Sequence, residues 1–308
     1  MSENAPVLVA VDGSEGSTAA VRYAAAEASR LGADLRILHV APDYLPIAAL
    51  YPMPLPFTPD EFHATGEAVL ADALRVAQEL MDPARITTRL AGGDRVFGIL
   101  DAAGTARIVV LGNDRVPLLQ RLAVGSTVGN VAARAQVPVV AVPSGWTPRS
   151  AFRRIVVAVK QYDAAPLGLI DAALERAEAQ RSSLQIVHVW DFPEAYGDLV
   201  VGMMNFKEWA ETVDHRLRED AADVLAKHPD VEVQVVARYG QPAKVLQELS
   251  ADADLLVVAR RAHAFPVGHF GSTGRALLSE SRCPVEVLPI SEVAARDDEP
   301  ASHSPAHA

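Results

Sequence analysis

The chain is written as two similar halves, and this repeat limits its fold more than any other feature of its 308 residues. PVLVAVDGS corresponds to RIVVAVKQY, and LRILHVAP corresponds to LQIVHVWD. Further along, GGDRVFGILDAA corresponds to YGQPAKVLQELS, RIVVLG to DLLVVA, and VGSTVGNVAARAQVPVVAVP to FGSTGRALLSESRCPVEVLP. The offset between partners stays nearly constant, from Val11 and Val159 to Pro138 and Pro284. We therefore expect two domains, residues 1–146 and 151–290, joined near the polar stretch SGWTPRS.

Within each half, short apolar runs alternate with segments of helical periodicity. Nearly continuous Val, Ile and Leu runs are typical of parallel strands that are buried on both faces. Apolar residues that recur every three or four positions predict the helices between them. Such alternation predicts an α/β fold in which each half is a doubly wound, five-stranded parallel sheet with helices on both faces. In the first half the expected strands are 7–11, 34–40, 85–90, 107–111 and 138–142. The expected helix stripes are Ala20, Ala24, Ala28 and Leu31 in the first half, and Leu167, Ile170, Leu174 and Ala177 in the second.

Charge and cysteine content exclude several classes of protein. The net charge is −11 and the pI is about 5.3, so nothing suggests binding to nucleic acid or to an anionic membrane. No apolar run approaches the length of a membrane span, and the first residues do not resemble a signal peptide. The single cysteine, Cys283, lies in an apolar strand and is expected to be buried and inert. We expect a cytoplasmic protein with a disordered tail over 291–308.

A long connection at one sheet edge indicates a possible ligand site. GNDRVPLLQRLAVGST, residues 112–127, joins an expected strand to an expected helix, and connections of this length are usually functional. The first strand ends in VDGS at the same edge. Backbone N–H groups of a glycine-edged loop and of a helix N-terminus suit phosphate, and Asp12 suits ribose hydroxyls or a metal ion. A purely structural interpretation has equal weight, because Gly-Ser-Thr is an ordinary helix start with Ser126 as N-cap, and Asp-Gly-Ser is an ordinary turn. Neither a Walker A pattern nor GxGxxG occurs.

These motifs together resemble the universal stress protein family, in its two-domain actinobacterial type. The resemblance covers about residues 5–290 and rests on V-x-V-D-G-S, on L-H-V at the end of the second strand, on P-V-x-V-x-P, and on the spacing of the glycine loop. It implies Rossmann-like domains of the adenine nucleotide alpha hydrolase type, ATP bound in the loop, and dimers through the last strand. It also implies a role in stress survival, dormancy or growth control, with little or no catalysis.

The resemblance places the ATP site in the first half. It implies that Ala10 lines the base pocket, that Val40 meets adenine through its backbone, and that Asp12 lies near the ribose and Mg²⁺. Arg115 replaces the loop's second glycine, so it either disturbs the loop or binds phosphate through its guanidinium. The remaining predicted loop residues are Gly112, Asn113, Asp114, Gly125, Ser126 and Thr127.

The second half departs from this pattern. Lys160 stands where Asp12 stands, Ala259 replaces Gly112, and the loop is one residue shorter. Its weaker candidate site consists of Val189, Gly271, Ser272 and Thr273, and its loop is basic through Arg260, Arg261, His263 and His269. We expect the second half to be a degenerate, supporting domain.

The repeated histidines and the proline-rich insertion have no chemical role that the sequence requires. His39 and His188 recur because the repeat recurs, so we expect packing roles and no metal or catalytic pair. The proline-rich insertion at 44–59 either contacts the other domain or a partner, or covers its own sheet edge, and the sequence does not choose between these.

Three functions follow in order of preference. The first is an ATP-binding regulatory protein, a homodimer read by protein partners that the sequence does not identify. The second is a scaffold that has lost ATP and acts through protein partners. The third, ranked last because no general base is evident, is a weak ATPase or an adenylate kinase-like enzyme. No catalytic residue is predicted.

Overall fold

The computed structural model describes residues 5–43, 58–114, 127–148, 153–160, 166–191, 205–261 and 271–290. The proline-rich insertion before Thr58, the loop from Arg115 to Ser126, the basic loop 262–270 and the tail 291–308 lie outside these residues.

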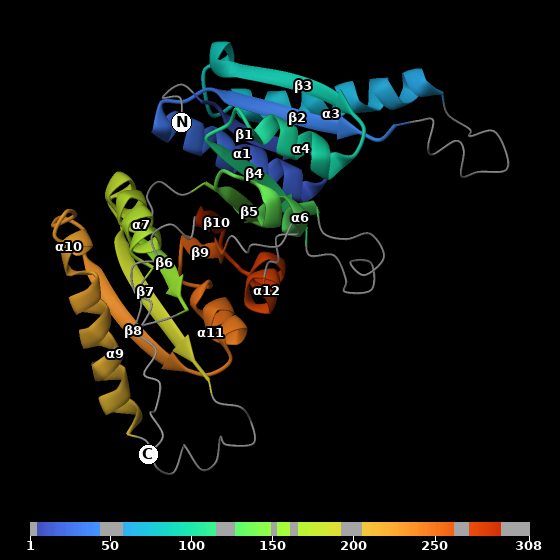
Figure 1. Cartoon of the computed structure of the whole chain (residues 1–308). Helices are drawn as coiled ribbons and strands as arrows, with labels where there is room; N and C mark the ends of the chain where they lie inside the picture. The colour runs from blue at the N-terminus through green and yellow to red at the C-terminus, as the bar shows by residue number, and fades with distance from the viewer. Residues whose placement is uncertain are drawn as a thin grey trace, which may run out of the picture.

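Each half of the chain folds into alternating strands and helices, as the repeat predicted (Figure 1). The elements of the first domain are β1 (Val7–Val11), α1 (Glu15–Leu31), β2 (Leu35–Ala41), α3 (Pro59–Gln78), the 3-10 turn Pro83–Arg85, β3 (Ile86–Gly92), α4 (Arg95–Ala103), β4 (Ile108–Asn113), α6 (Thr127–Arg134) and β5 (Val139–Pro143). The elements of the second domain are β6 (Arg154–Val159), α7 (Leu167–Gln180), β7 (Ser183–Trp190), α9 (Phe206–Asp220), α10 (Ala222–Leu225), β8 (Val233–Tyr239), α11 (Pro242–Leu249), β9 (Leu255–Arg261), α12 (Ser272–Glu280) and β10 (Val285–Ile290).

The two sets of five parallel strands form one continuous sheet. The strand order is β3-β2-β1-β4-β5-β10-β9-β6-β7-β8, and every neighbouring pair is parallel except β5 and β10, which are antiparallel. Figure 1 shows the two domains meeting at these central strands. The parallel sheets were predicted, but their fusion within one chain was not. The last strands, through which the resemblance implies dimers, already pair with each other.

The helices cover the sheet in two different ways. On one face, a single apolar core runs from α4 and α6 of the first domain to α11 and α12 of the second, without interruption at the domain boundary. On the other face, α1 and α3 cover one core and α7 and α9 cover another. The domains are therefore joined by a shared core on one face and by separate cores on the other.

Helix α1 shows why the predicted periodicity produces this packing. Ala20, Ala24 and Ala28 are fully buried, and such small side chains let the helix approach the sheet closely. Ser14 caps its N-terminus by accepting a hydrogen bond from the Ser17 N–H, and Gly32 ends it in the left-handed conformation. In the second domain, Ile170, Leu174 and Ala177 are buried as expected, whereas Leu167 is exposed because it is the first residue of α7.

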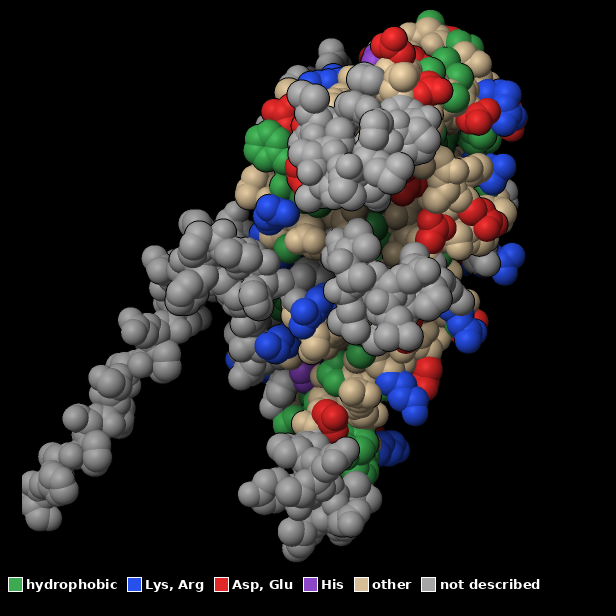
Figure 2. Space-filling model, turned by 90° about the vertical axis from the view of Figure 1, so that its right-hand side faces the viewer, with side chains coloured by type: hydrophobic (Ala, Val, Ile, Leu, Met, Phe, Trp, Pro, Cys, Tyr) green, Lys and Arg blue, Asp and Glu red, His purple; other side chains and the backbone are tan. Residues whose placement is uncertain are grey.

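Surface features agree with the acidic composition. On the face in Figure 2, described Lys and Arg side chains are mixed with Asp and Glu side chains and form no continuous basic band. None of the helices in the described ranges combines the length and the apolar character that crossing a bilayer requires.

Candidate functional site

The first domain has a hollow where β1 and β4 end side by side. Their parallel pairing brings Ala10 opposite Leu111. The hollow has an empty volume of about 400 Å³, including open solvent at its mouth. It is lined by Ala10, Val11, Asp12, Ser17, Val40, Arg95, Ile99, Leu111, Gly112, Thr127 and Val128. Six of these eleven residues are apolar, and the polar side chains are those of Asp12, Ser17, Arg95 and Thr127, so apolar walls and polar groups lie side by side, as in small-molecule sites.

Asp12 is fixed by the start of α1. Its Oδ1 accepts a hydrogen bond from Ser17 Oγ at 2.6 Å and one from the Ser14 N–H at 3.2 Å. Burial raises the pKa of this carboxyl, but the hydrogen bonds from Ser17 and Ser14 and the charge of Arg95 outweigh burial, so its pKa is lowered. Asp12 is therefore a carboxylate in a rigid turn. The structural interpretation of Asp-Gly-Ser is correct, and it leaves Oδ2 facing Arg95.

Arg95 and Ile99 line the hollow from α4, and the sequence interpretation missed both. Arg95 Nη1 lies 3.9 Å from Asp12 Oδ2, and both side chains are about half exposed. Asp94 caps α4 by accepting from the Phe97 N–H at 2.8 Å, which places the first turn of the helix at the sheet edge. The signal was available as Gly-Gly-Asp before an apolar periodic segment.

Gly112 lines the hollow, but packing alone requires that it has no side chain. A Cβ at this position would lie 2.3 Å from the backbone carbon of Gly16 and 2.6 Å from the Ser17 nitrogen. The end of β4 therefore passes directly against the first turn of α1, and no larger residue fits there.

Asp114 lies next to this close approach and does not line the hollow. Its Oδ1 accepts a hydrogen bond from the Gly16 N–H at 2.8 Å. The carboxylate thus binds at the N-terminus of α1, where the helix dipole favours negative charge. This contact holds Asp114 against α1, whereas the sequence interpretation placed it in the ligand loop.

Asn113 and Arg260 both connect the domains. Asn113 donates through Nδ2 to the Leu278 carbonyl oxygen of α12, across the boundary. Arg260, its counterpart in the repeat, donates through Nη2 to the Ala135 carbonyl oxygen at 2.6 Å and is only 7% exposed. Burial lowers the pKa of this guanidinium. Asn113 was predicted as a loop residue for the ligand and Arg260 as part of a basic loop, and the structure gives both a contact between domains.

The remaining predicted loop residues divide into two groups. Thr127 is the first residue of α6 and lines the hollow. Arg115, Gly125 and Ser126 lie outside the described residues.

The second domain keeps the apolar part of the site and replaces the polar part. By the repeat, Ala158, Val189, Leu246 and Val258 correspond to the apolar residues Ala10, Val40, Ile99 and Leu111. Lys160 stands in place of Asp12, Pro166 in place of Ser17 and Pro242 in place of Arg95. Gly271 is the N-cap of α12, and Ser272 and Thr273 open that helix. Among the residues described there, the carboxylate acceptor for a ribose is thus missing at the equivalent position, and Lys160 offers only donors.

The repeated histidines and the cysteine have structural roles, as predicted. His39 Nδ1 lies 2.7 Å from the Val11 carbonyl oxygen, and His188 Nδ1 lies 3.2 Å from the Val159 carbonyl oxygen. Cys283 is buried, and burial raises the pKa of its thiol to about 12. Within the ranges that the structure describes, no group of three or more His, Cys, Asp or Glu side chains could hold a metal ion.

Comparison with known proteins agrees with this architecture. The model of the universal stress protein family matches residues 3–143 and again 151–289. A universal stress protein of Mycobacterium tuberculosis is 28% identical over 290 residues, which cover 91% of this chain and 96% of that one. One of Mycolicibacterium smegmatis is 30% identical over 286 residues, which cover 89% and 91%. Among solved structures, a universal stress protein from Archaeoglobus fulgidus covers 93% of this chain and 97% of its own with a TM-score of 0.65 and 19% identity.

The fold and the repeat define a tandem α/β protein with Rossmann-like, mostly parallel sheets. The chain belongs to the universal stress protein family, with one family domain in each half.

Proposed function

We propose that this protein is an ATP-binding regulator of stress response or dormancy, with one working nucleotide site in the first domain. The observation that carries the proposal is the hollow beside β1 and β4, whose apolar walls end at one fixed carboxylate. An adenine ring suits the walls formed by Ala10, Val40, Ile99 and Leu111. Asp12 Oδ2 would accept from a ribose hydroxyl.

The phosphates would lie toward α6 and Arg95. Thr127 opens α6, so the first N–H groups of this helix are directed toward the sheet edge. Arg95 offers a guanidinium beside the same opening. Among the described residues that line the hollow, Asp12 is the only one with an acidic side chain, so a Mg²⁺ ion would be held mainly by the phosphates.

The second domain is proposed as a support without a nucleotide. Lys160, Pro166 and Pro242 replace Asp12, Ser17 and Arg95, three of the four polar side chains that line the first site. Arg260, which could have attracted an anion, is instead committed to the Ala135 carbonyl oxygen.

A regulatory role and no turnover are proposed together, since no residue in the described lining of the hollow is placed as a general base for a γ-phosphate. The alternative is a scaffold without a nucleotide, and the use of Asn113 and Asp114 in structural contacts favours it. Because β5 and β10 pair within the chain, we propose that any association of two chains uses a different surface. The cytoplasmic location stays a prediction of the sequence.

The test is the nucleotide content of purified protein, released by denaturation and separated by chromatography. We expect about one ATP per chain, retained in Lys160→Ala, the matched change in the second domain, and lost in Asp12→Ala. Asp12→Asn keeps the acceptor for Ser17 and Ser14, so it separates loss of charge from loss of the turn. About two per chain would contradict the degenerate second domain. If the purified protein carries no nucleotide and titration calorimetry detects no binding of ATP, the ATP proposal is wrong and the scaffold without a nucleotide is the remaining function.

A further inference from the structure

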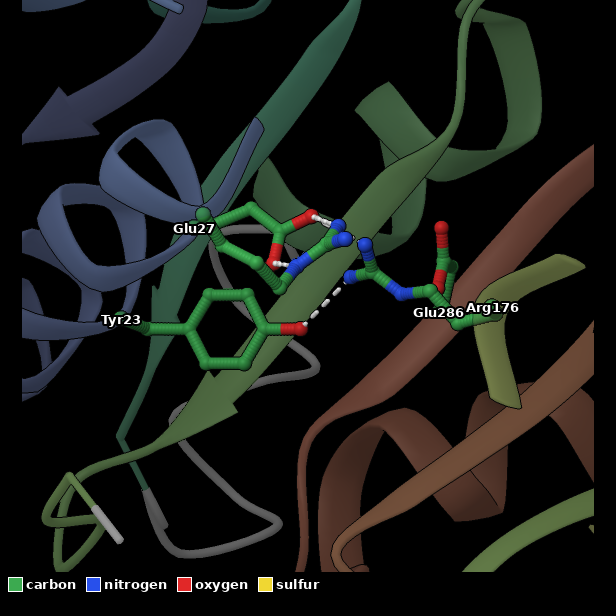
Figure 3. A network of polar contacts seen from close by, with 5 residues as sticks. Tyr23, Glu27, Arg176 and Glu286 are labelled. Carbon is green, nitrogen blue, oxygen red and sulfur yellow. Dashed lines mark hydrogen bonds and ion pairs between the residues drawn. The ribbon is translucent and has the colours of Figure 1, made fainter. Parts of the chain in front are cut away.

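A buried polar cluster lies where α1 of the first domain meets α7 and β10 of the second (Figure 3). Arg176 of α7 donates through Nη1 to Glu27 Oε1, and through Nη2 to the Tyr23 hydroxyl at 3.1 Å. Its Nε lies 3.3 Å from Glu286 Oε2. The side chains of Glu27, Arg176 and Glu286 are 4%, 10% and 8% exposed. We call Tyr23, Glu27, Arg176 and Glu286 the axial cluster.

The cluster lies on the local twofold axis that relates the two domains. In the antiparallel pair, Glu286 stands opposite Val140. The repeat offset in these strands is 146, from Pro138 and Pro284, and 140 plus 146 is 286. A residue that pairs with its own counterpart marks the axis.

Glu27 and Arg176 are also counterparts. Helices α1 and α7 end at the left-handed residues Gly32 and Arg181, which gives a helix offset of 149, and 27 plus 149 is 176. The ion pair therefore joins equivalent positions of the two helices, with opposite charge in each domain. The other two members of the cluster also have different residues at their counterpart positions. Tyr23 corresponds to Ala172, and Glu286 corresponds to Val140.

This arrangement has different consequences for like and unlike pairs of domains. Two first domains joined through the same surface would bring Glu27 against a second Glu27. Two second domains would bring Arg176 against a second Arg176. Only the unlike pair places opposite charges of α1 and α7 across the axis. In a pair of second domains each Arg176 would keep its own Glu286, whereas in a pair of first domains the two Glu27 carboxylates would face each other in a buried site, which is costly.

We propose that the axial cluster selects the partner of each domain, so that the last-strand surface of the first domain accepts the second domain and rejects a second copy of itself. Buried ion pairs add little to stability compared with apolar residues of similar size, and selection of a partner or a register is their best-attested use.

The other contacts at the boundary do not discriminate in this way. The core on the opposite face is apolar in both domains. Asn113 and Arg260 both donate to backbone carbonyl oxygens, which each domain offers near the end of α6 or α12. A like pair could reproduce these contacts but could not reproduce the ion pair.

The charge states agree with the geometry. Burial raises the pKa of Glu27, but Arg176 and Arg30 outweigh it and hold the pKa below its usual value. Burial raises the pKa of Glu286, which Arg176 only partly offsets. Arg30, on the same helix, forms an ion pair with Glu27, and its Nη2 lies 2.5 Å from Glu27 Oε1. Glu27 and Arg176 are therefore the charged pair across the boundary.

The experiment uses the full chain with a protease site inserted between Pro143 and Arg154, cut after folding so that both halves stay present. The nicked halves are unfolded together in urea and refolded, so that partners reassort without either half having to stay folded alone. Native mass spectrometry then counts like and unlike pairs, and nitrogen-15-labelled nicked protein confirms that partners have reassorted. We expect nearly all wild-type pairs to be unlike. The apolar variant Glu27→Met/Arg176→Met/Glu286→Val should raise the like pairs toward the random value of about half. If it keeps only unlike pairs, the proposal is wrong.

A second measurement covers the case in which the apolar variant does not fold. In the intact chain, Arg176→Met leaves Glu27 buried without its partner and should lower Tm by about 5–10 °C. Arg85→Met is the matched control, because Arg85 also pairs with an acid, Asp34, at 3.0 Å but is 38% exposed. It should change Tm by less than about 2 °C. Equal effects of the two changes would overturn the proposal.

Discussion

Gly112 shows how one residue can serve a packing need inside a candidate ligand site. It lines the hollow, yet the atoms that forbid a side chain there belong to α1. The sequence pattern pointed to Gly112, but on the assumption that this glycine belongs to a loop that binds phosphate. Ala259, at the same place in the second domain, fits this explanation, since α7 begins three positions later than α1 by the helix offset of 149.

Gly112→Ala is therefore expected to destabilise the protein whether or not it binds a nucleotide. The new Cβ would overlap backbone atoms that cannot rotate away, so the free energy of unfolding should fall by about 2 kcal/mol or more. Urea denaturation without ligand measures this. Gly168→Ala is the matched control, because Gly168 lies in α7 with nothing within 4 Å of its added Cβ. That change should raise the free energy of unfolding by about 0.5–1 kcal/mol. A neutral Gly112→Ala would contradict the packing explanation.

At the scale of elements, the sequence predicted the strands and the buried helix faces, because local apolar patterns determine both. The strands of the first half begin one residue or less from the expected positions, since apolar runs define them well. The stripes of α1 and α7 were also predicted. Arg95 was missed because its importance depends on where α4 meets the sheet, and Arg260 was misinterpreted because its acceptor, Ala135, lies in the other domain. Contacts between distant segments leave no periodic signal in a sequence.

His228 connects the end of α10 to α7 and should make stability depend on pH. Its Nδ1 lies 2.8 Å from Glu178 Oε2, and its Nε2 lies 3.4 Å from Asp171 Oδ1. The hydrogen bond to Glu178 raises the pKa of His228, burial opposes this, and Asp171 adds to it, so the net pKa is above 6.5. A raised folded-state pKa stabilises the protein fully below the unfolded value, and this stabilisation is lost as pH rises through the folded value.

The measurement is Tm against pH for the wild type and His228→Gln. The difference in Tm should be largest below pH 6.5 and should shrink as pH rises above that value. His215→Gln is the control, because His215 pairs with Glu219 on the surface of α9 with its side chain 75% exposed. A difference for His228→Gln that stays constant with pH would show that the imidazole is not held in its charged form.

At the scale of the whole molecule, the repeat predicted two domains but did not predict that they share one sheet and one core. The ten strands form a single sheet, and the core beneath α4, α6, α11 and α12 crosses the boundary. The sequence could not show this, because either half alone specifies only its own five strands, and pairing of β5 with β10 depends on both. The family model, which matches each half separately, describes the domains and not their junction.

Because the core and the sheet are continuous, we expect the two domains to unfold together. The three tryptophans allow each domain to be observed separately, since Trp146 packs against Tyr23 in the first domain and Trp190 and Trp209 contact each other in the second. Trp146→Phe leaves only the second domain visible by fluorescence, and Trp190→Phe/Trp209→Phe leaves only the first. In each variant the fluorescence midpoint in urea should coincide with the midpoint by far-ultraviolet circular dichroism, which follows both domains. Comparing two probes within one variant removes the effect of the substitution itself. Separate midpoints would mean that the shared core is too weak to couple the domains, and the junction would then act as a docking surface between two independent folding units.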